Sequence, residues 1–156
     1  MPRQRDRPRL NGAMPAKDRI PVGPLGVRFL VEADDSNGSV TVFECDVPAD
    51  ARMPAPHSHD AFEETVYGLE GRTTYTVAGE TIELDPGDSL CIRRGVVHAF
   101  ANHGSGEARF LAIISPGVFG SAYFVEVAEV IAASAGGPPD LAAIGEVMRR
   151  HGLTPA

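Results

Sequence analysis

Short runs of β-branched and aromatic residues, broken by turn residues about every eight to twelve positions, fill the sequence between Gly26 and Ser115. This spacing is typical of an antiparallel β-sandwich or barrel and shows no alternation of strands with helices. Breaks such as Ser36-Asn37-Gly38 and Ala78-Gly79 favour hairpin turns. We therefore predict an all-β antiparallel fold with strands at residues 27–33, 39–47, 64–69, 73–77, 80–84, 89–92, 99–101 and 109–115.

The period of the apolar residues changes after Pro116. A helical face is predicted from the spacing of Phe124, Val127, Ala128 and Ile131. Asp140 is a suitable N-cap for a second short helix, whose apolar side is Leu141, Ile144 and Met148. We predict that these helices pack on the outside of the barrel or on a second copy of the chain, not on a cofactor. Exposed strand edges and an amphipathic tail together favour a homodimer.

Length and charge limit the functions that this chain can have. Its 156 residues suit one domain, and no apolar run approaches the roughly 18 residues of a membrane span. The net charge is -7, and residues 1–19 hold six of the 14 basic residues and two of the 21 acidic ones. The rest of the chain is therefore strongly acidic, which argues against a nucleic-acid partner. No secretory signal is recognisable, so we expect a soluble, cytoplasmic protein.

The charge distribution and the change of apolar period after Pro116 together suggest three regions. Residues 1–19 are expected to be a disordered basic leader, 20–118 the barrel, and 119–156 a C-terminal helical extension. Two cysteines, Cys45 and Cys91, lie in strand-like segments without the spacing of a metal site. We expect both to be small buried residues.

Two of the five histidines stand one residue apart, in His57-Ser58-His59, close to the pair Glu63 and Glu64. Alternation along an extended chain turns both imidazoles to one face, whereas at most one of the two glutamates can join them. A further histidine, His98, begins another strand-like stretch. Neutral imidazoles with one carboxylate suit first-row divalent metals.

The spacing of these residues resembles the two motifs of the cupin family. The first motif is matched by His57, His59, Glu64 and Gly71, and the second by Gly87, Gly95, His98 and Asn102. The chain departs from the pattern at Ala51, where the family has glycine, and at Arg93, where it has proline. The strand end Tyr67-x-Leu69-x-Gly71 and the helical tail after Ser115-Pro116-Gly117 also look similar to single-domain cupins grouped with quercetin-type dioxygenases.

The resemblance implies a double-stranded β-helix, or jelly-roll barrel, that holds one divalent transition metal: Fe, Mn, Ni, Co, Cu or Zn. The implied ligands are His57, His59, Glu64 and His98, with Glu64 also acting as catalytic proton acceptor. Six-coordinate metal would keep two positions open, whereas tetrahedral zinc would keep none.

An apolar substrate pocket of aromatic size is expected around the metal, lined by residues that share a face with its ligands. The candidates are Val66, Gly68 and Phe100. Gly68 is open to two interpretations, because a glycine inside a strand marks either close approach by a ligand or a bulge or tight packing.

Three functions remain open. The first is an oxidoreductase, dioxygenase-like, that acts on a small enolisable or phenolic molecule. The second is a metal-assisted isomerase, cyclase or lyase that uses no oxygen. The third is a non-catalytic module that binds or senses a small molecule, with the metal as an anchor.

Overall fold

The computed structural model describes residues 12–53 and 55–156. Most of the predicted basic leader lies outside the described residues. The remainder of that segment lacks regular secondary structure, yet Lys17 binds Asp35 at 2.9 Å and Arg19 pairs with Asp46 at 3.1 Å. The chain is thus attached to the barrel slightly before residue 20.

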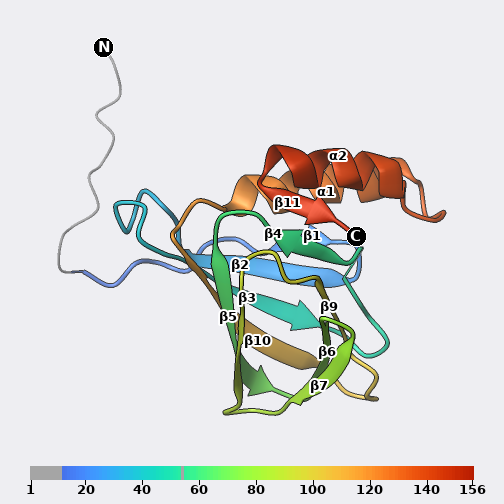
Figure 1. Cartoon of the computed structure of the whole chain (residues 1–156), viewed down its shortest axis with the longest axis horizontal. Coiled ribbons are helices and arrows are strands. Elements are labelled where there is room, and N and C mark those ends of the chain that lie inside the picture. The colour runs from blue at the N-terminus through green and yellow to red at the C-terminus, as the bar shows by residue number, and fades with distance from the viewer. Residues whose placement is uncertain (1–11, 54) are drawn as a thin grey trace.

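Two β-sheets and two helices make up the described chain (Figure 1). The larger sheet has the strand order β1-β2-β3-β10-β5-β8, and the smaller one β11-β4-β9-β6-β7. The elements are β1 (Ile20–Val22), β2 (Leu25–Val31), β3 (Thr41–Val47), β4 (His57–His59), β5 (Glu63–Glu70), β6 (Thr73–Val77), β7 (Glu80–Leu84), β8 (Ser89–Ile92), β9 (His98–Ala101), β10 (Ala108–Ser115), α1 (Ser121–Ala133), α2 (Leu141–Arg150) and β11 (Leu153–Pro155).

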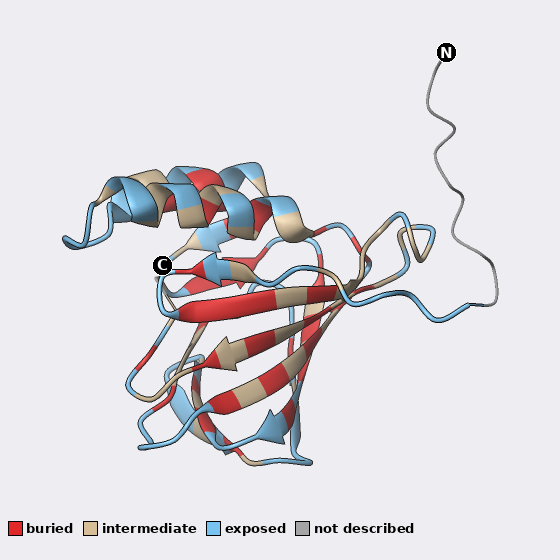
Figure 2. Ribbon diagram, turned by 180° about the vertical axis from the view of Figure 1, so that it is seen from behind, coloured by how far each residue is buried: buried red, intermediate tan, exposed pale blue. Residues whose placement is uncertain are grey.

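All described strand pairs are antiparallel, and the core lies between the two sheets. Burial alternates strictly along β3 and β10, and Figure 2 shows the resulting bands. Such alternation is what a sheet with one face on the core requires. The predicted all-β barrel with C-terminal helices is confirmed, and strands β6, β7 and β8 have the predicted ends.

The short strands β1 and β11 were not predicted. Each has three residues and contains a proline, Pro21 or Pro155. Three residues give too little alternation to recognise, and proline is normally a signal against a strand. Both strands lie at the edge of a sheet, where a missing N–H is tolerated.

The two helices lie across one end of the barrel (Figure 1). The N-cap prediction is confirmed, because the side chain of Asp140 accepts a hydrogen bond from Ala143 N at 3.0 Å. The sequence predicts that the helices pack on the outside of the barrel or on a second copy of the chain, and the structure adds a further role for α1. Tyr123 and Val127 of α1 are buried and line the internal cavity, because α1 closes the open end of the barrel.

The two cysteines have different environments. Cys45 is 2% exposed in the core, as expected, whereas Cys91 is exposed on β8. The prediction for Cys91 was wrong because its neighbour Ile92 occupies the inward-facing position of this edge strand. No helix in the part of the chain that the structure describes is both long and apolar enough to cross a membrane.

Candidate metal centre

Three histidines from two neighbouring strands meet inside the barrel. His57 and His59 come from β4, and His98 comes from β9, where it is paired in register with His57. Their side chains offer ring nitrogens that all lie within 4.8 Å of one another. All three residues are buried, with at most 6% of their surface exposed. Alternation on β4 thus brings the two imidazoles to one face, as predicted.

Backbone carbonyls fix the orientation of two of these rings. Nδ1 of His57 donates to the carbonyl of Ala55 at 3.2 Å, and Nδ1 of His98 donates to that of Val96 at 3.0 Å. A carbonyl only accepts, so Nδ1 carries the proton and the Nε2 lone pair points inward when the ring is neutral. A histidine that binds a metal through one ring nitrogen typically donates the N–H of the other to such a carbonyl.

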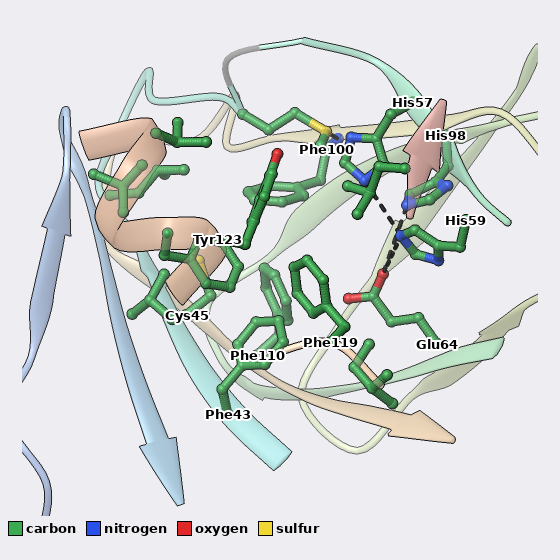
Figure 3. A pocket seen from close by; sticks show the side chains of 18 of the residues that line it. Phe43, Cys45, His57, His59, Glu64, His98, Phe100, Phe110, Phe119 and Tyr123 are labelled. Carbon is green, nitrogen blue, oxygen red and sulfur yellow. Dashed lines mark hydrogen bonds and ion pairs between the residues drawn. The ribbon is translucent and has the colours of Figure 1, made fainter. Parts of the chain in front are cut away.

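Glu64 is the fourth group at this centre. Its Oε2 atom lies 3.6 Å from Nε2 of His59 and 3.6 Å from Nε2 of His98 (Figure 3). Glu64 is 9% exposed and enters from β5 in the opposite sheet. The structure therefore brings together all four residues that the sequence selected.

Burial and the contact between Glu64 and the imidazoles together determine the pKa values of this centre. Burial lowers the pKa of His57 to about 3 and that of His59 to about 4, so both rings are neutral at pH 7. Burial acts in the same direction on His98, but its interaction with Glu64 raises the pKa of His98 above the usual value. Burial also acts to raise the pKa of Glu64, and the nearby imidazoles reverse this effect.

The donor set fits a divalent cation. Nε2 of His57 and Nε2 of His59 face each other at 3.3 Å, and the carboxylate of Glu64 stands beside them. Lone pairs at such a distance repel unless a proton or a cation lies between them. Three imidazoles, which bind metals in their neutral form, and one carboxylate match first-row divalent metals in ligand type. Cys45 also lines the cavity but is not among the residues whose ligand atoms converge, and burial raises the pKa of its thiol.

The neighbouring glutamate faces outward. Glu63 accepts hydrogen bonds from Arg94, at 2.7 Å to Nη2 and 2.8 Å to the backbone N–H. These bonds lower the pKa of Glu63 to about 2. Strand alternation thus separates the pair into one inward and one surface carboxylate.

The asparagine that matches the second motif has a structural role in this fold. Asn102 is 2% exposed, and its Nδ2 donates to the carbonyls of Val47 and Gly106 at 2.9 and 2.8 Å. Its Oδ1 accepts from the N–H of Gly104 at 2.9 Å. These bonds hold the loop that follows β9, the strand on which His98 lies.

An apolar cavity of about 60 Å³ adjoins the histidines. Its walls come from both sheets and from α1, and Figure 3 shows Phe43, Phe110 and Phe119 in the same pocket as the histidines and Glu64. A cavity of roughly 150 Å³ is needed to hold benzene, and one water takes about 30 Å³. The cavity is therefore smaller than the aromatic size expected from the sequence.

Of the three predicted pocket residues, Phe100 lines this cavity and the other two do not. Val66 is fully buried in the core, away from the cavity wall. A side chain at Gly68 would collide with the backbone of Asp85. The turn between β7 and β8 binds Gly68 directly, through Gly68 N to Asp88 O at 2.9 Å, so tight packing and not a ligand explains this glycine.

Sequence reasoning missed two hydroxyl-bearing residues of the cavity, Tyr75 and Tyr123. Tyr75 could have been found, because it occupies an inward position of a correctly predicted strand and is in register with Phe100. Its hydroxyl is buried and has no hydrogen-bond partner among the described residues. A buried unpaired hydroxyl costs roughly 1–3 kcal/mol. Tyr123 could not have been found, since nothing local shows that α1 closes the barrel.

Comparisons with known proteins agree with this geometry. The cupin domain family model matches residues 43–114, which contain all four residues of the centre. The chain is 29% identical to quercetin 2,3-dioxygenase of Bacillus subtilis (strain 168) over 102 residues, which are 65% of this chain and 30% of that protein. It is 40% identical to the polyketide synthase CurC of Streptomyces cyaneus over 60 residues, 38% of this chain and 39% of that protein.

The chain thus spans well under half the length of either curated relative. Among solved structures, KdgF from Halomonas sp. superimposes with a TM-score of 0.57 at 17% identity, covering 64% of this chain and 88% of that one. This likeness concerns the fold. Residues 43–114 thus match a cupin domain, and the barrel topology and the histidine cluster support a place for this chain in the cupin superfamily.

Proposed function

We propose that this cupin is a metal-dependent enzyme that acts on a small enolisable or phenolic molecule, with dioxygenase-like chemistry. The observation that carries the proposal is a set of three buried, convergent imidazoles and one buried carboxylate beside an apolar cavity. A structural metal would not need an adjoining cavity. The similarity to quercetin 2,3-dioxygenase supports the dioxygenase class.

His57, His59, His98 and Glu64 would hold the metal, which when bound supplies a Lewis acid for an enolate or phenolate oxygen. The carbonyls of Ala55 and Val96 keep two of the imidazoles in the tautomer that presents Nε2. Glu64 would take the proton of the substrate hydroxyl at a carboxylate oxygen, since it is the only carboxylate at this centre among the described residues. The apolar walls exclude water from the reacting group.

Cavity size favours a small substrate. At about 60 Å³, the cavity holds only a few non-hydrogen atoms unless α1 or its aromatic side chains move. A flavonol would require such a movement, whereas a short diketone or hydroxycarbonyl compound requires less.

A metal-assisted isomerase or cyclase is the second candidate. The 40% identity to the polyketide synthase CurC over 60 residues favours it, because polyketides are rich in enolisable carbonyl groups. In this case Glu64 would move a proton between two positions of the substrate, and no oxygen would be consumed.

The experiment is metal analysis of protein purified without added metal, followed by aerobic and anaerobic screens of flavonols and diketones. Glu64→Gln is compared with Glu63→Gln, its outward-facing neighbour. Oxygen-dependent turnover that is lost in Glu64→Gln alone supports the dioxygenase. Anaerobic turnover supports the isomerase, and stoichiometric metal with no turnover under either condition supports a binding module.

Two wider proposals remain from the sequence. The chain forms a homodimer, for which the exposed Val125 on α1 and Leu141 on α2 are suitable contacts, being 43% and 59% exposed. It acts in the cytoplasm on a small molecule and not on nucleic acid. A monomer mass in light scattering would contradict the first proposal.

A further inference from the structure

The hydroxyl group of Tyr75 is the feature of the cavity that the proposed chemistry does not use. Tyr75 lies in the middle of β6, paired with Phe100 of β9 and Ile82 of β7. Its side chain is 1% exposed and lines the cavity. The two pairings fix the strand on both sides, so the phenol ring has a defined position beside Phe100 and Phe110, with centroids 5.7 Å away in each case.

This hydroxyl differs from other buried polar groups in the barrel. Asn102 is about as deeply buried, but each of its side-chain polar atoms has a partner. Within the described residues, four buried side-chain atoms have none: Arg28 Nε, Thr41 Oγ1, His59 Nδ1 and Tyr75 Oη. Only His59 and Tyr75 line the cavity, and His59 already belongs to the metal centre. Tyr75 is thus a cavity-lining residue whose polar group has no partner and no role in the metal centre.

The hydroxyl is a hydrogen-bond donor for a ligand. Burial, together with the negative charge of Glu64, raises the pKa of Tyr75 well above its usual value, so the phenol keeps its proton. A buried donor without an acceptor is unfavourable, and phenylalanine at this position would avoid that cost. The remaining wall is largely aliphatic and aromatic, including Phe43, Phe110 and Ile114, and none of its polar side chains is a hydrogen-bond partner of the Tyr75 hydroxyl.

We propose that Tyr75 is a second anchor for the ligand, and that it donates a hydrogen bond to an oxygen acceptor lying apart from the group held at the metal centre. The inference rests on the proposed function of the metal site. It restricts the ligand to a difunctional class: a short apolar skeleton with an anionic oxygen group at one position and a carbonyl or carboxylate oxygen at another. Keto acids and hydroxycarbonyl compounds belong to this class.

The test uses three pairs of small carboxylates on protein loaded with Co²⁺: pyruvate and propionate, acetoacetate and butyrate, and 4-oxopentanoate and pentanoate. Within each pair only the ketone oxygen differs, and across the pairs its distance from the carboxylate increases. Binding is measured by calorimetry for the unaltered chain, for Tyr75→Phe, and for Tyr67→Phe. Tyr67 is 42% exposed on β5 and serves as the matched control.

We expect the unaltered chain and Tyr67→Phe to prefer the keto acid in at least one pair by about tenfold, which corresponds to about 1.4 kcal/mol, and Tyr75→Phe to lose that preference. Propionate, butyrate and pentanoate should bind all three proteins alike. Retention of the preference by Tyr75→Phe, or no preference in any pair, overturns the role of Tyr75. If no carboxylate binds the metal-loaded protein, the proposed ligand site itself is wrong.

Thermal denaturation of the ligand-free proteins gives an independent readout. Because Tyr75→Phe removes an unpaired buried hydroxyl, its Tm should equal or exceed that of the unaltered chain. A Tm several degrees lower would mean that the hydroxyl is already satisfied inside the protein, and it would overturn the proposal even if binding changed.

Discussion

The barrel and the C-terminal extension (residues 119–156) both border the cavity, but they contribute different chemistry. The barrel provides every residue of the metal centre, on β4, β5 and β9. The extension provides walls such as Phe119, Tyr123 and Leu153. The barrel therefore determines what the site can bind, whereas the extension determines how much space a ligand has.

The extension also supports β4, the strand that carries His57 and His59. β4 has one registered pair with β9, His57 with His98, but three with β11, from Leu153–His59 to Pro155–His57. Ala156 N also donates to Pro56 O at 3.1 Å, and Asp60 N to Gly152 O at 2.9 Å. Two of the three histidines are thus held in place by a strand that follows them by almost a hundred residues. At β4, therefore, the extension contributes to the position of the histidines as well as to the cavity wall.

The largest effect on metal binding should come from a change in the barrel. Substitution His98→Ala removes one of the three convergent imidazoles, and the affinity for Co²⁺ should fall more than the roughly 10–100-fold caused by loss of a supporting hydrogen bond. Elemental analysis and Co²⁺ titration measure this change. His103→Ala, at an exposed loop position, is the control. Stoichiometric metal in His98→Ala would remove His98 from the ligand set.

Removal of residues 153–156 tests the support that β11 gives to β4. We expect a decrease of roughly 10–100-fold in Co²⁺ affinity, because β4 loses its longer pairing while its histidines remain. Far-ultraviolet circular dichroism checks that the sheets persist. Thr154→Ala, which removes only the 2.6 Å bond from Thr154 Oγ1 to Asp60, is the matched control. Unchanged affinity in the shortened chain would show that the barrel alone positions the histidines.

Phe124→Ala tests whether the extension limits the size of the cavity without affecting the metal centre. Phe124 lines the cavity and packs on Phe43, with ring centroids 5.2 Å apart, so its loss should cost about 3 kcal/mol of unfolding free energy, at the low end for phenylalanine because it is only partly buried. Metal affinity should stay unchanged.

The enlarged cavity of Phe124→Ala should approach the roughly 150 Å³ that holds a benzene ring, so phenol should bind more tightly than it does to the unaltered chain. Calorimetry measures both ligands, phenol and Co²⁺. Val125→Ala, at the exposed neighbouring position, should alter neither. A large loss of Co²⁺ binding in Phe124→Ala would contradict the separation of wall from metal centre.

The smallest effect concerns a surface contact within the extension. Glu126 of α1 accepts hydrogen bonds from His151 at 3.0 Å and Arg150 at 2.9 Å, and these bonds lower the pKa of Glu126. A lowered pKa in the folded state means that the stabilisation is present above the ordinary value of 4.5 and is lost as pH falls through the folded value.

The Tm of Glu126→Gln should therefore lie slightly below that of the unaltered chain at pH 7, and the difference should disappear in acid below pH 4.5. Solvent screens this exposed contact, so the difference is small. Glu129→Gln, exposed on the same helix, should show no such trend. A Tm difference between the two proteins that increases as the pH falls would contradict this prediction.

Local pattern accounts for much of the barrel. Strand ends at β6, β7 and β8 followed from turn residues, and the inward turn of His57 and His59 followed from alternation along an extended segment. The resemblance to the first cupin motif, through the spacing from Glu64 to Gly71, distinguished Glu64 from Glu63, which the structure places on the surface with Arg94. Each of these predictions depends on neighbours within a few residues.

The sequence by itself determined most of the longer barrel strands and the inward orientation of His57 and His59, because alternation and turn residues are properties of adjacent positions. Only the tertiary structure decided that β11 pairs with β4, that α1 closes the barrel, and that the cavity is small. A three-residue strand has no recognisable period, and the apolar face of a helix does not identify the part of the protein against which it packs. Those contacts join segments far apart in the chain, and their geometry exists only once the sheets have formed.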